Sequence, residues 1–172
     1  TLAKMAGAKP LGIVPKRRTA LIIEGAPGEP GSARWPLIAD CGETWYCRPE
    51  ATTKLLLSPA DATPTEPCDA RPEELDIALA VDRFQKAGEL PVKRIEHSWA
   101  GLRSFTPDGS LAIGFDPCIE GFFWLAGQGG YGIQPAPAAS ALVAALVTGS
   151  SLPKGLLDAG VQVDALSPAR FR

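Results

Sequence analysis

The loop at residues 127–132 carries four glycines, Gly127, Gly129, Gly130 and Gly132. Three of them form a G-x-G-x-x-G pattern between the apolar run "GFFWLA" and an alanine-rich segment. A glycine leaves its backbone N–H open to close approach, and the first turn of a helix carries roughly half a positive charge. We therefore expect the loop either to approach a flat or anionic group or to serve only as a tight turn between a strand and a helix.

A dinucleotide-binding site is the first function that such a glycine pattern suggests. That site needs a second parallel strand after the helix and an acidic residue about twenty residues beyond the glycines. The sequence after Gly149 contains no convincing strand, and Asp158 is the acidic candidate. The pattern therefore argues against a pyrophosphate site at this loop.

The cysteines and the histidine form no pattern of metal ligands. Cys41, Cys47, Cys68 and Cys118 are spread without a C-x-x-C pair, and His97 is the single histidine. We therefore expect no metal site. The mixed strand and helix pattern is not that of a small disulfide scaffold, so we expect reduced thiols and a cytoplasmic protein.

Charge and hydropathy argue against two further classes of protein. The formal net charge is -2 and the basic run Lys16–Arg18 is short, so nucleic-acid binding is not indicated. The longest apolar stretch, residues 136–147, contains Ser140 and is shorter than the ~20 residues of a membrane-spanning helix. The chain begins at Thr1 with its only methionine at Met5, which indicates a piece of a longer protein.

The elements that must position the glycine loop begin with a sheet. Runs rich in β-formers and bounded by turn residues predict strands at 19–24, 36–40, 43–49 and 53–59, with a loop at 25–36 after the first. The last two strands join across residues 49–52 as a hairpin, which predicts an antiparallel sheet.

A helix at residues 72–87 should cover one face of this sheet. Pro72 suits a first helical turn and Gly88 a helix end. Six apolar residues recur with helical spacing and should form the covering face: Leu75, Ile77, Ala78, Leu79, Val81 and Phe84.

The glycine loop itself lies among later elements. The sequence predicts a long strand at 92–105, a turn at Thr106–Gly109, which Asp108 should stabilise, and strands at 110–116 and 121–126. A helix follows at 136–148, and its apolar character on nearly all sides predicts that it is buried. We expect the tail, residues 150–172, to lie on the surface because it has no strong period.

Three segments of the sequence resemble the C-terminal part of the D-amino-acid oxidase family of FAD-dependent oxidoreductases. These segments are "SWAGLRSFTPDGSLAIG", "GFFWLAGQGGYGIQPAPAAS" and "LVTGSSLP". Weaker likeness to the substrate-domain strands of that family comes from "LGIVPKRRTALIIE" and "TWYCRPEATTKLLLSP". The resemblance thus spans most of residues 11–152.

The resemblance implies an α+β fold that belongs to a divided protein. Residues 1–104 would form part of the substrate-binding sheet domain, with an antiparallel or mixed sheet and a covering helix. Residues 105–172 would be the C-terminal strands and helix of a split FAD-binding domain. The N-terminal half that holds most of the FAD is absent from this sequence, so it would be a partner, and the exposed surface would favour self-association.

The resemblance also assigns residues to a site. Arg103 stands where the family's "GLR" motif places an arginine that grips the substrate carboxylate, and Tyr46 lies on a strand where tyrosines can line the pocket. The loop whose amides face the flavin ring comprises Gly127, Gln128, Gly129, Gly130, Tyr131, Gly132, Ile133 and Gln134. Gly130 replaces a second arginine of glycine-oxidase-like members, and no cysteine stands near Gly101, where some members attach FAD covalently, so we expect non-covalent FAD.

The reaction implied is hydride transfer from the α-carbon of an amine or amino acid to the flavin, which gives an imine that hydrolyses. No residue of this sequence is expected to act as a catalytic acid or base. Two alternatives remain open: a noncatalytic module, as an excised domain or a subunit of a split enzyme, and a carboxylate-binding or interaction domain that reuses the fold.

Overall fold

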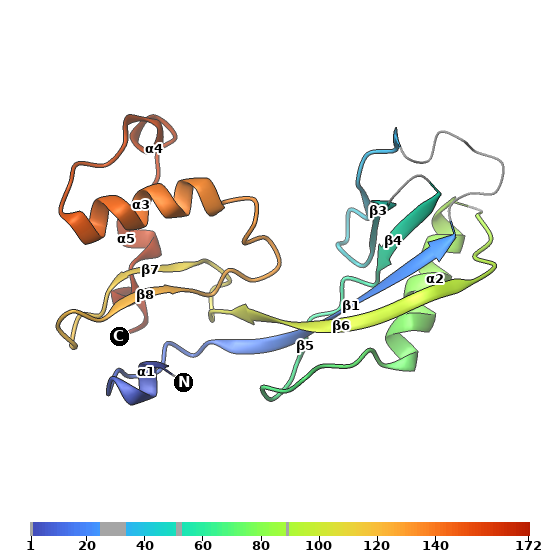
Figure 1. Ribbon diagram of the computed structural model, residues 1–172, viewed down its shortest axis with the longest axis horizontal. Coiled ribbons are helices and arrows are strands. Elements are labelled where there is room, and N and C mark those ends of the chain that lie inside the picture. Colours follow the sequence, from blue (N-terminus) through green and yellow to red (C-terminus); the bar gives the residue numbers. More distant parts are fainter. Residues whose placement is uncertain (1, 25–33, 51–52, 89) are drawn as a thin grey trace. The chain divides into compact units, whose positions relative to one another are not determined.

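Figure 1 shows the computed structural model of the chain, which describes residues 2–24, 34–50, 53–88 and 90–172. The chain forms two compact units. The sheet unit comprises Lys16–Leu102, and the hairpin unit comprises Thr1–Pro15 together with Arg103–Arg172.

The division of the chain differs from the expected one at the N-terminus. We expected residues 1–104 to form one domain, but residues 1–15 belong to the hairpin unit. Ala8 and Leu11 are buried there in one cluster with Trp124, which explains why this segment leaves the sheet.

The sheet unit contains a sheet with the strand order β2-β3-β4-β1-β5, and β6 also pairs with β1. Its strands are β1 Val14–Glu24, β2 Ile38–Ala39, β3 Tyr46–Glu50, β4 Lys54–Ser58, β5 Thr63–Pro64 and β6 Ile95–Phe105. Strand β1 pairs antiparallel with β4 and β5, and β3 pairs antiparallel with β2 and β4, which confirms the predicted antiparallel sheet. The first strand begins at Val14 rather than Thr19, and most of the predicted loop 25–36 lies outside the described residues.

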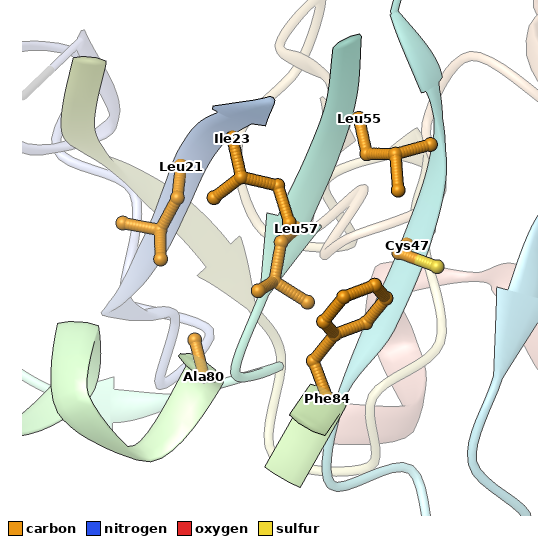
Figure 2. Packing of buried hydrophobic residues seen from close by; sticks show 7 residues of the cluster. All are labelled: Leu21, Ile23, Cys47, Leu55, Leu57, Ala80 and Phe84. Carbon is orange, nitrogen blue, oxygen red and sulfur yellow. The ribbon is translucent and has the colours of Figure 1, made fainter. Parts of the chain in front are cut away.

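Helix α2, Glu74–Gly88, covers one face of this sheet (Figure 1). The core contains Leu21 and Ile23 from β1, Cys47 from β3, Leu55 and Leu57 from β4, and Ala80 and Phe84 from α2. Figure 2 shows these side chains gathered between the strands and the helix. Alternate residues of β1 and β4 point to this face, as a strand period of two requires. Each fully buried leucine stabilises the unit by about 1.5–3 kcal/mol.

The face of α2 that meets the sheet differs from the predicted one. Leu75 is 67% exposed and Ala78 is also exposed, whereas Ala80 and Asp76 are buried. Asp76 is buried because it accepts a hydrogen bond of 2.9 Å from Arg17 on β1. A face chosen by apolar residues alone cannot include an aspartate that is buried by an ion pair, so the prediction was wrong in the first turns of the helix.

The hairpin unit is built on two antiparallel strands, β7 Ala112–Phe115 and β8 Phe123–Ala126, and on helix α3, Ala136–Thr148. One face of the hairpin packs on α3, where Ile113 and Leu142 lie in one buried cluster. The other face buries Ala112 and Trp124 against the N-terminal segment, which includes the short helix α1, Leu2–Met5. Both units together confirm the α+β fold class.

Helix α3 has the predicted bounds but not the predicted burial. Within the described chain only Leu142 and Ala145 of this helix are buried, and Val147 is 54% exposed. A hairpin of two strands can cover only one side of a helix. The prediction that α3 is buried on nearly all sides was therefore wrong for this chain, and its other side presents alanine and valine to the surroundings.

The C-terminal tail is ordered and partly buried, contrary to the prediction that it lies on the surface. It forms α4 Lys154–Asp158, α5 Val163–Leu166 and the 3-10 helix η2 Pro168–Phe171. Leu156 and Pro168 are buried. Pro168 packs against Gly114, where a Cβ atom would lie 3.0 Å from the proline Cδ, so a glycine at this position lets the tail approach β7.

Candidate functional site

The glycines of the loop between β8 and α3 are required by the shape of the loop itself. Gly127 and Gly129 have φ angles of 75° and 55°, a region that side chains disfavour. A Cβ atom on Gly127 would lie 2.5 Å from the methyl of Thr106, and one on Gly129 would lie 2.9 Å from the ring of Phe105. The tight turn thus accounts for these two glycines without any ligand.

The loop is anchored to the end of β6 and to the turn that follows. The Gly129 amide donates to the carbonyl of Ser104 at 2.9 Å, and the Tyr131 hydroxyl donates to the carbonyl of Gly109. The turn is stabilised as expected, since Asp108 accepts from the Ser110 amide at 3.0 Å. Strand, turn and loop therefore form one hydrogen-bonded assembly within the hairpin unit.

Several amides of the loop donate to no protein acceptor that the structure describes. The N–H groups of Gly130, Gly132 and Ile133 donate to no acceptor within the described ranges. Ile133 is 94% exposed, and Pro135 gives the N-terminus of α3 no side-chain cap. Free donors at the positive end of a helix favour a ligand that carries negative charge or carbonyl oxygens.

Arg103 lies beside these amides. It is the third residue from the end of β6, is half-buried, and donates from Nη1 to the carbonyl of Gly130 at 3.2 Å. A guanidinium has five N–H donors in a planar fork. In the described part of the chain no carboxylate lies within ion-pair distance of Arg103, so it keeps donors for a carboxylate ligand.

Two carboxylates of the hairpin unit, those of Asp108 and Asp116, are already paired with arginines. Arg170 donates to Asp108 at 2.7 Å, and this bond holds the pKa of Asp108 well below its usual range. Burial alone would raise the pKa of Asp116, but hydrogen bonds from Trp124, the Cys118 amide and an arginine outweigh it and lower the pKa to about 2. Neither carboxylate is therefore free to offset the charge of Arg103.

Tyr46 belongs to the sheet unit, whereas Arg103 and the glycine loop belong to the hairpin unit. Tyr46 pairs with Ser58 in the register of β3 with β4 and is half-buried. Its neighbour Trp45 packs edge-on against Phe84 of α2, with ring centroids 5.9 Å apart. Successive strand residues point to opposite faces, so Tyr46 lies on the sheet face that α2 does not cover.

The cysteines and the histidine form no metal site within the described residues. Among the described residues, no group of three or more His, Cys, Asp and Glu side chains is placed to hold a metal ion. Cys41, Cys47, Cys68 and Cys118 are free thiols, and burial raises the pKa of Cys47 to about 11. His97 is exposed and stacks on Trp99.

No helix in the described portion of the chain has the length and apolar character needed to cross a membrane.

The topology around α3 is not that of a dinucleotide-binding unit. The helix ends at Gly149, which has a φ of 67°, and the described residues after it form α4, α5 and η2 without a strand. The strand before it, β8, is half of an antiparallel hairpin. A pyrophosphate fingerprint requires a parallel βαβ unit, so the G-x-G-x-x-G pattern here is not such a fingerprint.

The family of the chain follows from its sequence and agrees with this architecture. Residues 1–146 match the model of the DAO family, described as FAD dependent oxidoreductase. The chain belongs to the DAO family. This membership confirms the resemblance seen in the segments around Arg103 and the glycine loop.

Solved structures of two oxidases and a dehydrogenase share the fold of this chain. Glycine oxidase from Geobacillus kaustophilus matches with a TM-score of 0.73 and 22% identity, over 98% of this chain and 42% of that one. L-proline dehydrogenase from P. horikoshii matches with a TM-score of 0.75 and 24% identity, over 98% of this chain and 43% of that one. Iminodiacetate oxidase from Chelativorans sp. BNC1 matches with a TM-score of 0.69 and 19% identity, over 96% of this chain and 43% of that one. This DAO-family chain thus spans less than half the length of each.

Sequence reasoning missed the arginines of the C-terminal tail. Arg170 bonds to Asp108, and Arg172 donates to Asp116 at 2.7 Å and to the carbonyl of Lys9 at 2.9 Å. Both contacts join residues far apart in the chain, and no local sequence pattern predicts them. The single signal is that this short tail carries two arginines in its last three residues.

Proposed function

We propose that this chain supplies the substrate-carboxylate grip and the ring-facing loop of an FAD-dependent oxidoreductase that oxidises an amine or amino acid. The observation that carries the proposal is the position of Arg103, whose guanidinium lies 3.2 Å from the Gly130 carbonyl and next to unpartnered amides. The guanidinium of Arg103, which has unused donors, suits a ligand with a carboxylate. The free loop amides beside it suit a ligand with polar ring atoms.

The described loop fits the ring end of a flavin. The amides of Gly130, Gly132 and Ile133 lack protein acceptors, and the exposed Ile133 side chain offers apolar surface that a flat ring could cover. When bound, a flavin would accept the hydride from the substrate α-carbon. The loop amides and the start of α3 would stabilise negative charge near the ring carbonyl, because that end of the helix is positive and uncapped.

Arg103 would hold the substrate by its carboxylate. A planar guanidinium can donate to both carboxylate oxygens at once, and such a contact contributes about 1.5–3 kcal/mol. Fixing the carboxylate orients the α-carbon and lowers the entropic cost of the reaction. The related structures support a substrate of this kind, because glycine, L-proline and iminodiacetate, which their names give, all join an amine to a carboxylate.

The remaining assignments complete the proposed enzyme. The substrate-binding domain would comprise residues 1–104, and the part of the FAD-binding domain in this chain would comprise residues 105–172. Residues 1–15 pack in the hairpin unit. An N-terminal FAD-binding half would be the partner and hold most of a non-covalent FAD. Tyr46 would line the substrate side of the sheet. A cytoplasmic location and self-association complete the proposal.

A steady-state comparison in the complete protein tests the role of Arg103. We expect Arg103→Met to raise KM for amino carboxylates by about 10- to 100-fold, the loss of one charge-assisted contact. The preference for these substrates over amines without a carboxylate should disappear. Arg71→Met removes an exposed arginine and is the control, with kinetics expected to match the wild type. Unchanged KM and unchanged preference in Arg103→Met would refute the proposed grip.

A further inference from the structure

The guanidinium of Arg170 fastens the turn between β6 and β7. It donates from Nε to Asp108 at 2.7 Å and from Nη2 to the carbonyls of Ser110 and Leu111 at 2.9 Å and 3.0 Å. Arg170 and Asp108 are 62 residues apart in the chain, and the arginine side chain is only 15% exposed. Because one largely buried arginine makes these several bonds, it holds the backbone of the turn in a single position.

The same turn supports the glycine loop at two points. The Tyr131 hydroxyl donates to the Gly109 carbonyl. The methyl of Thr106 fills the space where Gly127 lacks a side chain, while its hydroxyl donates to the Ser110 carbonyl at 2.6 Å. Arg170 and Thr106 therefore hold the same carbonyl, that of Ser110, from the tail and from the turn.

We propose that Arg170 is a positioning residue for the ring-facing loop, through which the C-terminal tail sets the direction of the free amides at Gly130, Gly132 and Ile133. This inference rests on the proposed function, because those amides matter to chemistry only if a flavin meets them. The path of action runs from Arg170 to the turn at Asp108 and Ser110, and from that turn through Tyr131 to the loop.

Arg172 provides a matched control in the same tail. It too pairs with a carboxylate, Asp116, at 2.7 Å and donates to a backbone carbonyl, that of Lys9, at 2.9 Å. Its bonds to the carbonyls of Lys9 and Pro10 stabilise the contact between the tail and the N-terminal segment, and among the described residues none of its hydrogen bonds reaches the turn at residues 106–109. Loss of either arginine should therefore destabilise the hairpin unit, but only loss of Arg170 should disturb the loop.

The experiment compares Arg170→Met, Arg170→Lys and Arg172→Met in the complete protein with FAD. The readouts are the melting temperature, the visible absorption spectrum of bound flavin, the Kd for FAD, and hydrogen exchange of the loop amides. We expect both methionine variants to lower the melting temperature. Arg170→Met alone should shift the flavin bands, raise the Kd about tenfold and speed exchange in the loop. Arg170→Lys should recover part of each change, since it keeps one bond to Asp108.

Two results would overturn the inference. One is an Arg170→Met protein, or an Arg170→Lys protein if the first does not fold, whose spectrum, Kd and exchange equal those of the wild type. The other is the same set of changes in Arg172→Met, which would indicate general loosening. A wild-type protein that takes up no FAD would instead defeat the proposed function itself, so the two failures are distinguishable.

Discussion

Replacement of Gly127 by alanine tests the geometry of the loop most sharply. The residue has a φ of 75°, and an added Cβ would lie 2.5 Å from Cγ2 of Thr106. The left-handed backbone costs about 1–2 kcal/mol for a residue with a side chain. Overpacking against the threonine adds about 1–3 kcal/mol. We therefore expect Gly127→Ala to lower the free energy of unfolding by about 2–5 kcal/mol.

Two further variants separate the backbone cost from the steric cost. Gly121 has a φ of 74° and no atom within 4 Å of an added Cβ, so Gly121→Ala should show the backbone cost alone, about 1–2 kcal/mol. Thr106→Ser removes the clashing methyl and keeps the hydroxyl that donates to Ser110, at a cost of about 1 kcal/mol. In that background Gly127→Ala should cost no more than Gly121→Ala does.

Urea unfolding of the wild type, the three single variants and the Thr106→Ser/Gly127→Ala double variant measures these differences. Gly127→Ala should also weaken FAD binding, and Thr106→Ser should relieve that loss as it relieves the steric cost. The reasoning fails if Gly127→Ala costs no more than Gly121→Ala in the wild-type background. It fails equally if the effects of Thr106→Ser and Gly127→Ala simply add.

Three other predictions follow from buried charges and from the sheet face. Asp116→Asn should lower the free energy of unfolding by about 3 kcal/mol at pH 7, measured by urea unfolding. Because the hydrogen-bonded carboxylate has a pKa of about 2, the difference in unfolding free energy between wild type and variant should shrink as the pH falls from about 4 towards 2. Arg17→Met should cost about 3–5 kcal/mol by thermal unfolding, since it strands the buried carboxylate of Asp76; a loss below about 1 kcal/mol would be inconsistent with a buried pair. Tyr46→Phe should raise KM for the amine about fivefold and leave the Kd for FAD unchanged; an unaltered KM would remove Tyr46 from the site.

Local sequence signals predicted helix α3 and the turn before β7 closely. Pro135 and Gly149 bracket the helix that the sequence places at 136–148, and α3 has those bounds. The turn at Thr106–Gly109 was predictable because proline and glycine impose its backbone angles, and Gly109 has a φ of 76°. Such signals act within a few residues, which is why they survive in the folded chain.

Features that depend on distant partners were not predictable. Asp76 is buried only because Arg17 meets it, and the tail is fixed only because Arg170 and Arg172 find carboxylates far away in the chain. For the site, the glycine spacing pointed to the loop and the family resemblance pointed to Arg103, but no pattern predicted the hydrogen bond between Arg103 and the Gly130 carbonyl. Long-range pairing leaves no periodic trace in a single sequence.

Anaerobic reduction of the complete protein by amines tests the central claim most directly. Purified with FAD, the wild type should be yellow and should lose its visible absorption when an amine that carries a carboxylate is added. Arg103→Met should bind FAD as well as the wild type but require at least tenfold more substrate for the same bleaching. A colourless protein that takes up no FAD, or an Arg103→Met protein bleached at the wild-type substrate concentration, would contradict the account.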